Sequence, residues 1–259
     1  MATLNKRIIL EERDLLILKY LFEYKVSSSD LIKREFFSQH SACYRRLRRL
    51  MEAGFVQTVI THTKCRQNIF GITALGIKQL GFAVSRFDNL RGLTPKFHLT
   101  TDHDLAVQVV RQALITSPVI TQFTSENSLA HLFRTQYGTV KIPDQDYKLP
   151  DGAFTLWTPS VNMKVALEVE ISKKSKSRLQ KAFELLITGA DFNIALYVVK
   201  DSEMLTYLKN IYETVWNRPS IQCQSSLHSC YFALLDDLVQ SGSTATILGL
   251  EGSLSLKQL

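Results

Sequence analysis

Long apolar runs are absent from this sequence of 259 residues. No stretch approaches the roughly 18 consecutive apolar residues that cross a bilayer. The N-terminal segment MATLNKRIILEERD has no apolar core followed by a cleavage site, so it does not read as a secretory signal. We therefore expect no membrane association and a cytoplasmic protein.

Cysteine is scarce, with four residues dispersed along the chain. Cys223, His228 and Cys230 lie close together, but their spacing matches no zinc-binding pattern. Cys43 and Cys65 are isolated. Four unpaired thiols in a reducing compartment explain this usage better than disulfides do.

Positive charge is concentrated in the first third of the chain. Residues 1–80 contain 14 Lys and Arg against 7 Asp and Glu, whereas residues 81–259 contain 17 of each kind. Neutralising phosphates with release of counterions provides most of the non-specific affinity for nucleic acid. A small basic domain attached to a neutral body therefore indicates a nucleic-acid contact.

The basic third has a readable order of elements. Its pattern predicts a helix at 11–24, a capped second helix at 31–36, a third helix from 38 to 53, two strands at 55–61 and 67–72, and a closing helix from 73. Gly54 is a natural stop for the third helix. Helix, helix, Arg-rich helix and hairpin within about 75 residues resembles a winged helix-turn-helix domain.

In that arrangement the third helix enters the major groove of DNA, led by its N-terminal residues. The residues expected to contact bases or phosphates are Gln39, His40, Ser41, Tyr44, Arg45, Arg46, Arg48 and Arg49, with Lys64 and Arg66 at the tip of the hairpin. A winged helix used for protein contacts is the alternative. Four arginines within five positions favour DNA.

Beyond residue 81 the pattern changes. Residues 82–101 have no sustained period and read as a linker. The elements predicted after it are helices at 103–116, 126–134, 176–188 and 204–216, and strands at 119–125, 153–158, 164–171 and 192–199. Signals weaken after 217, where we expect a strand or short helix at 231–238 and a flexible Gly/Ser-rich tail at 241–259.

Acidic residues occupy one face of the strand predicted at 164–171. With period two, Val165, Leu167, Val169 and Ile171 point one way, whereas Glu168 and Glu170 point the other. Asp151, in Pro150-Asp151-Gly152, is placed to face them from the neighbouring strand. Carboxylates on a strand are costly to bury unless they hold a cation, and a divalent metal would account for them. A solvated strand face with a turn-forming Asp-Gly is the alternative.

These motifs, in the order helix–strand–strand–strand–helix–strand over 103–199, resemble the core of the PD-(D/E)xK nuclease superfamily. Asp151 matches the first carboxylate of that family and Glu168 the second, but Glu170 stands where a lysine is usual. Such a lysine can move elsewhere, and the resemblance offers Lys173, Lys174 and Lys176 as local candidates, with Lys176 slightly favoured. It implies Mg²⁺ or Mn²⁺ bound by Asp151, Glu168 and Glu170. His103 or Asp104 occupies the region where the first helix often supplies another carboxylate.

The basic domain, the His-Asp-Leu-Ala-Val helix start, Pro-Asp-Gly and Glu-Val-Glu together also resemble the plasmid replication-relaxation proteins, including MobC-class mobilization relaxases. That resemblance, over about residues 10–200, implies nicking of double-stranded plasmid DNA at a transfer origin, with relaxosome or coupling proteins as partners. Tyrosine relaxases use a His-hydrophobic-His metal site, which no pair of the six histidines forms. There is no Gly-rich phosphate loop for nucleotide hydrolysis either.

The expected fold is therefore α+β or α/β in two domains. We expect a winged helix at 1–81, a linker at 82–101, and at 102–240 a restriction-endonuclease-like αβββαβ domain with a mixed central sheet. Two functions are compatible with it. One is a metal-dependent endonuclease guided by its DNA-binding domain, and the other is a non-catalytic replication or transcription accessory protein with a degenerate nuclease fold.

Overall fold

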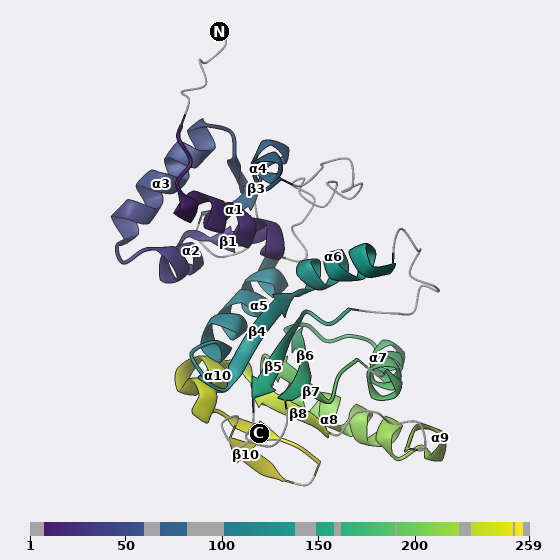
Figure 1. Cartoon of the computed structure of the whole chain (residues 1–259). Coiled ribbons are helices and arrows are strands. Elements are labelled where there is room, and N and C mark those ends of the chain that lie inside the picture. Colours follow the sequence, from purple (N-terminus) through teal and green to yellow (C-terminus); the bar gives the residue numbers. More distant parts are fainter. Residues whose placement is uncertain are drawn as a thin grey trace. The chain divides into compact units, whose positions relative to one another are not determined.

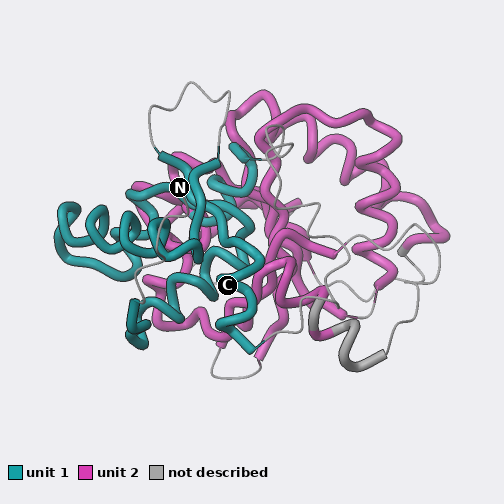
Figure 2. The backbone as a smooth tube through the Cα atoms, turned by 90° about the horizontal axis from the view of Figure 1, so that it is seen from above, with its two compact units in different colours: residues 1–108 teal, residues 109–259 magenta. Residues whose placement is uncertain are grey.

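The chain divides into two units, residues 1–108 and 109–259 (Figure 2). This computed structural model describes residues 8–59, 68–81, 101–137, 149–157, 162–189, 191–222, 229–250 and 252–255. Each unit contains a hydrophobic cluster of its own. A membrane span would need a long apolar helix, and the described ranges contain none.

The first unit combines short helices with a three-stranded antiparallel sheet of order β1-β3-β2 (Figure 1). Its elements are α1 (Glu12–Tyr24), β1 (Val26–Ser28), α2 (Ser29–Phe36), α3 (His40–Glu52), β2 (Val56–Val59), β3 (Ile69–Ile72), α4 (Ala74–Gln79) and the start of α5 (Thr101–Leu114). The predicted order of helices and hairpin is confirmed in the described part of the chain, with helix ends shifted by a few residues.

Strand β1 was not predicted, because its sequence Val-Ser-Ser read only as a helix break with capping side chains. The segment is both a strand and the cap of the following helix. The serines pair with β3 and are buried, and the Oγ of Ser28 also accepts the backbone N–H of Leu31 at 3.2 Å, which caps α2. Three residues are too few to show a period of two.

Local signals set the other helix ends in this unit. Glu11 and Asp14 form a reciprocal capping box at the start of α1. Gly54 follows α3 with φ +79°, a conformation that glycine adopts without steric cost, so the predicted stop is confirmed. The core beneath joins Ile17, Leu21 and Ile32 to Leu47 and Leu50 of α3.

Helix α5 begins within the predicted linker, at Thr101, and its first part belongs to the first unit. The side-chain Nε2 of Gln108 donates to the carbonyl of Val26 at 2.7 Å, a buried bond that joins α5 to β1. The remainder of the linker, 82–100, lies outside the described residues. The boundary between units thus falls inside α5 rather than before it.

The second unit is built on a mixed seven-stranded sheet of order β10-β9-β8-β7-β6-β5-β4. Its elements after α5 are β4 (Ile120–Ser125), α6 (Glu126–Tyr137), β5 (Gly152–Trp157), β6 (Asn162–Glu170), α7 (Lys176–Thr188), β7 (Ile194–Val199), α8 (Ser202–Trp216), α9 (Pro219–Gln222), β8 (Ser229–Leu234), α10 (Leu235–Ser241), the 3-10 turn η4 (Gly242–Thr244), β9 (Thr246–Leu248) and β10 (Ser253–Ser255). Strands β6, β7 and β8 run parallel, and the other neighbouring pairs are antiparallel.

The predicted flexible tail is wrong over β9 and β10. These strands extend the sheet from β8, and Ile247 is fully buried. The Gly and Ser residues around them obscured two three-residue strands, and Gly249 and Gly252 instead close the turn between them through a 2.8 Å backbone hydrogen bond. The mixed α+β fold and mixed central sheet are as expected.

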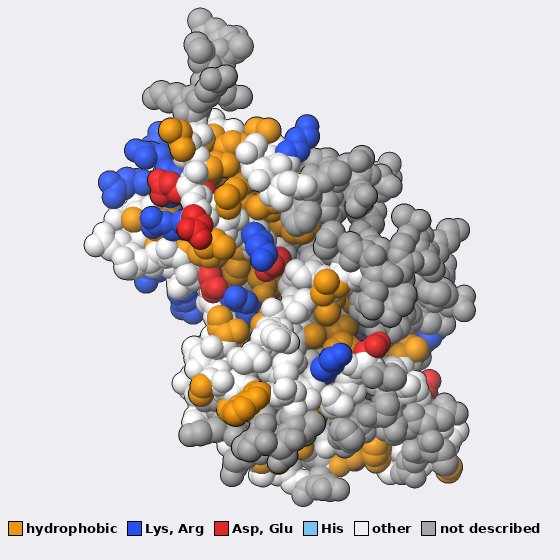
Figure 3. Space-filling view, in the orientation of Figure 1, with side chains coloured by type: hydrophobic (Ala, Val, Ile, Leu, Met, Phe, Trp, Pro, Cys, Tyr) orange, Lys and Arg blue, Asp and Glu red, His pale blue; other side chains and the backbone are white. Residues whose placement is uncertain are grey.

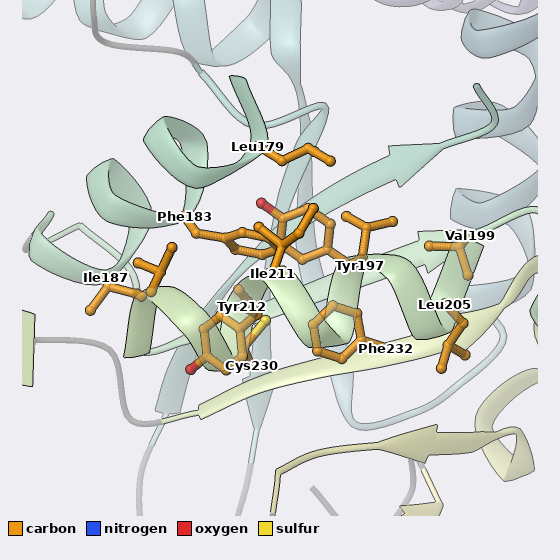
Figure 4. Close-up of a cluster of buried hydrophobic side chains, with 13 residues drawn as sticks. Leu179, Phe183, Ile187, Tyr197, Val199, Leu205, Ile211, Tyr212, Cys230 and Phe232 are labelled. Atoms are coloured by element: carbon orange, nitrogen blue, oxygen red, sulfur yellow. The ribbon is translucent and has the colours of Figure 1, made fainter. Parts of the chain in front are cut away.

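Aromatic side chains fill the space between the parallel strands and the helices α7 and α8. Figure 4 shows Phe183 of α7, Tyr197 of β7, Tyr212 of α8 and Phe232 of β8 gathered in one cluster, with ring centroids of Phe183 and Tyr197 4.9 Å apart. This packing fixes α7 and α8 against the sheet, and therefore fixes the loops at the carboxyl ends of β6 and β7.

Candidate functional site

Both faces of β6 are buried at its carboxyl end. Val165, Leu167 and Val169 are fully enclosed on one face, and on the other the carboxylate residues Glu168 and Glu170 are only 6% and 3% exposed. The alternation predicted from the sequence is present, but the alternative of a solvated strand face is wrong. Buried acids need partners, since an isolated buried charge is costly.

Asp151 joins Glu168 through the pairing of β5 with β6. Gly152 is the register partner of Leu167, so the preceding Asp151 lies next to Glu168 across the strand pair. The Oδ2 of Asp151 accepts the backbone N–H of Val169 at 2.8 Å, and Asp151 is 7% exposed. The two glutamates therefore flank the residue to which Asp151 is bonded.

A lysine pairs with one of the glutamates at the carboxyl end of β6. The ammonium of Lys174, whose side chain is 21% exposed, forms an ion pair with Oε1 of Glu170. Lys173 turns instead to Glu203, and Lys176, the first residue of α7, is exposed. Among the three candidate lysines, the structure places Lys174 at the carboxylates.

Tyr197 of β7 was not among the predicted site residues. It is the register partner of Glu168 on β7 and is almost completely buried. Burial, followed by the charges of Glu168, Cys230, Glu170 and Asp151, raises the pKa of Tyr197 well above its usual value. The phenol therefore stays protonated. In the sequence its only signal is a tyrosine within an apolar strand, and the parallel register then places it opposite Glu168.

A divalent metal fits these residues in chemistry, because Mg²⁺ and Mn²⁺ prefer oxygen ligands. The geometry is less complete. Within the described residues, no set of three or more His, Cys, Asp or Glu side chains is arranged to hold one metal ion. Glu170 is engaged by Lys174, which leaves Asp151 and Glu168 as the adjacent pair that would hold an ion. The three-carboxylate site stays a prediction.

A small cavity adjoins Glu168. It measures about 40 Å³ and is bordered by Pro150, Tyr197, side chains of α7 and the segment after that helix. A cavity needs at least roughly 10–15 Å³ to hold a water molecule, so this one can hold water beside Glu168.

The second candidate surface is α3 in the first unit. Its outer side is polar and exposed, and in Figure 3 Lys and Arg side chains gather over the part of the unit that α3 occupies in Figure 1. The predicted contact residues that are exposed there are Gln39, His40, Ser41, Tyr44, Arg45, Arg48 and Arg49. Arg48 pairs with the exposed Glu52, and Arg45 Nε donates to the carbonyl of Ser41. These weak exposed contacts leave the guanidinium groups available for phosphate.

Arg46 is the exception among the predicted DNA contacts. Its side chain is 14% exposed, its Nε donates to Oδ1 of Asp14 at 2.6 Å, and its Nη2 contacts Oδ2 of the same carboxylate. The bond to Asp14 raises the pKa of Arg46. Arg46 thus attaches α3 to α1, and we leave it out of the contact surface. Because Asp14 is 32 positions away in the sequence, the sequence alone does not distinguish Arg46 from the neighbouring arginines.

Four other predicted contributors either lie outside the described residues or belong to the first unit. Lys64 and Arg66 lie outside the described residues. His103 and Asp104 belong to the first unit, where the imidazole Nδ1 lies 3.7 Å from the Oδ1 of Asp104. They therefore add no observation to the acidic site of the second unit.

No protein-family model matches this chain, and no curated protein matches it. Among solved structures it is similar to the restriction endonuclease FokI bound to DNA, with 12% identity over 89% of this chain and 44% of that one, at a TM-score of 0.26. A structure of FokI gives 13% identity, 89% and 43% coverage, and the same TM-score. The chain thus spans less than half the length of these structures, and a TM-score this low supports no statement about function.

Proposed function

We propose that this protein is a metal-dependent DNA endonuclease, in which a winged helix in the first unit binds DNA and the acidic site of the second unit cuts it. The observation that carries the proposal is the adjacency of Asp151 and Glu168 across the β5–β6 pair, with the ion pair of Glu170 and Lys174 at the same end of β6. Open sheets commonly bind ligands at the carboxyl ends of their parallel strands. The resemblance to plasmid relaxases supports a finer proposal, nicking of plasmid DNA at a transfer origin.

In this proposal Asp151 and Glu168 would hold Mg²⁺ or Mn²⁺, an ion that polarises the scissile phosphate and stabilises the leaving oxygen. Lys174 takes the place of the usual strand lysine and brings a positive charge toward the negative charge that develops on the phosphate. Glu170 holds that ammonium in place. Tyr197, opposite Glu168 in the register of β6 and β7, stays neutral.

The test uses the full chain and supercoiled DNA carrying its gene and flanking sequence, with Mg²⁺ or Mn²⁺. Glu168→Gln should abolish nicking while DNA affinity stays within about twofold, because the contacts of α3 lie in another unit. Asp237→Asn, which alters an exposed acid of α10, is the matched control and should cut normally. Calorimetry should show Mn²⁺ binding that Asp151→Ala removes. Equal cutting by Glu168→Gln and wild type would exclude this site.

DNA binding is tested separately by salt titration. Arg45→Ala with Arg49→Ala should weaken binding and reduce the slope of log K against log salt by about one for each lost phosphate contact. An unchanged slope would contradict the placement of α3 on DNA.

A non-catalytic DNA-binding protein is the second candidate function, and one observation favours it. Glu170 stands where a lysine is expected from the resemblance, and its carboxylate is engaged by Lys174. If wild-type protein binds DNA but never nicks it under either metal, this second function replaces the first.

A further inference from the structure

Two residues of α8 contact the segment 171–175, which joins β6 to α7 and carries both Lys173 and Lys174. Glu203 and Tyr207 are four positions apart, so they share one side of the helix. The Oε1 of Glu203 lies 3.7 Å from Nζ of Lys173. The same ammonium lies 4.7 Å from the centroid of the Tyr207 ring.

The hydroxyl of Tyr207 reaches the next residue of the segment. It donates to the backbone carbonyl of Lys174 at 3.4 Å. The ring therefore contacts the side chain of one lysine, and the hydroxyl contacts the backbone of the other. Tyr207, Lys173, Lys174 and Glu170 also border one common hollow, so these contacts form a single group.

Within this group the two adjacent lysines have different partners. Lys173 and Lys174 have the same side chain and are adjacent in the irregular segment between β6 and α7. With Lys173 held over the aromatic face, its side chain is 61% exposed, whereas that of Lys174 points inward to Glu170. Cation–π attraction and a hydrogen bond both favour this orientation.

We propose that Tyr207 is a positioning residue that selects Lys174, rather than Lys173, as the partner of Glu170. The importance of this selection for cleavage rests on the proposed endonuclease function, but the selection itself does not. Tyr207 touches no carboxylate of the site among its described contacts and acts through the two lysines.

The experiment is competitive acetylation of the full chain, with the extent of reaction at each lysine read by peptide mass spectrometry. An ammonium held by a buried carboxylate reacts slowly, so in the wild type Lys174 should react about tenfold more slowly than the exposed Lys176. Tyr207→Leu removes both contacts and should speed reaction at Lys174 by about tenfold, and Tyr207→Phe, which loses only the hydroxyl, by about threefold. Reaction at Lys176 should not change.

Two further variants serve as positive and negative controls. Glu170→Gln removes the carboxylate and should free Lys174 directly. Thr206→Ala changes a neighbouring exposed residue of α8, whose hydroxyl donates to the carbonyl of Ser202, and should leave Lys174 protected. If Tyr207→Leu fails to fold, the conclusion depends on Tyr207→Phe, which keeps the ring.

Reaction at Lys174 within about twofold of wild type in the folded Tyr207 variants would overturn the proposal, as would an equal rise at Lys174 and Lys176. Acetylation needs neither DNA nor metal. A protein that never cuts DNA but shows the selective rise at Lys174 would therefore remove the endonuclease proposal and support the role of Tyr207.

Discussion

Arg46 should stabilise the fold of the first unit rather than bind DNA, and Arg46→Ala tests this directly. The substitution leaves the carboxylate of Asp14, whose side chain is 1% exposed, without its guanidinium partner. The backbone N–H of Glu11 would still donate to that carboxylate at 2.7 Å, but one N–H does not neutralise a buried charge.

Breaking a buried ion pair by removing one partner costs about 3–5 kcal/mol. We expect the low end, about 3 kcal/mol, because Arg46 also reaches the exposed Glu11 and is not completely enclosed. For a domain of 60–100 residues this corresponds to a fall in melting temperature of roughly 12–24 °C. Arg45→Ala, on the exposed side of the same helix, should change stability by less than about 0.5 kcal/mol.

The assay is urea denaturation followed by far-ultraviolet circular dichroism. Trp157 and Trp216 are the only tryptophans and both lie in the second unit, so their fluorescence follows that unit separately. The double variant Asp14→Ala with Arg46→Ala should cost less than the sum of the two single variants. A cost below about 1 kcal/mol for Arg46→Ala, or additive single effects, would refute a buried pair. Normal stability with lost DNA affinity would return Arg46 to the contact surface.

Two further predictions concern the first unit. Burial, and after it the charge of Asp30, raises the pKa of the Cys43 thiol to about 11. The stability that the buried, protonated thiol contributes is complete below the unfolded pKa of 9.0 and is lost as the pH rises toward 11, by at most about 1.4 kcal/mol per pH unit. Cys43→Ala should remove this part of the alkaline loss of stability, as measured by denaturation curves at several pH values. Gly76→Ala should destabilise the unit by about 1–3 kcal/mol, although alanine normally favours a helix, because the added Cβ would lie 2.4 Å from the carbonyl oxygen of Phe55. An increase in melting temperature for this variant would contradict that contact.

Strong local signals made most of the fold predictable. The helix at 176–188 and the strands around Asp151 and Glu168 were placed closely because their apolar periods extend over several residues. The short strands β1, β9 and β10 were not, since three residues carry no period and their pairing partners are distant in sequence. Gly and Ser around β9 and β10 therefore read as a tail.

For the acidic strand, the sequence predicted the shared face of Glu168 and Glu170 but not the contacts these residues make. Register on β6 is local, so Glu168 and Glu170 share a face as expected. The partners of these residues come from other elements. Lys174, which pairs with Glu170, is contacted at its backbone by Tyr207 of α8, and Tyr197 is placed opposite Glu168 by the parallel register of β7. In the same way, Arg46 differs from its neighbours only because Asp14 of α1 lies beside it.

The parallel arrangement of β6, β7 and β8 affects the order in which the second unit assembles. Asp151 and Glu168 meet in an antiparallel pair of neighbouring strands, a contact of short sequence separation. Tyr197 and Tyr207 join them only after β7 has paired beside β6 and α8 has docked, which requires closing longer loops through α7. Non-local pairing of this kind slows folding. In a refolding chain, the acidic pair should therefore form before the tyrosines and the lysine segment that Tyr207 holds.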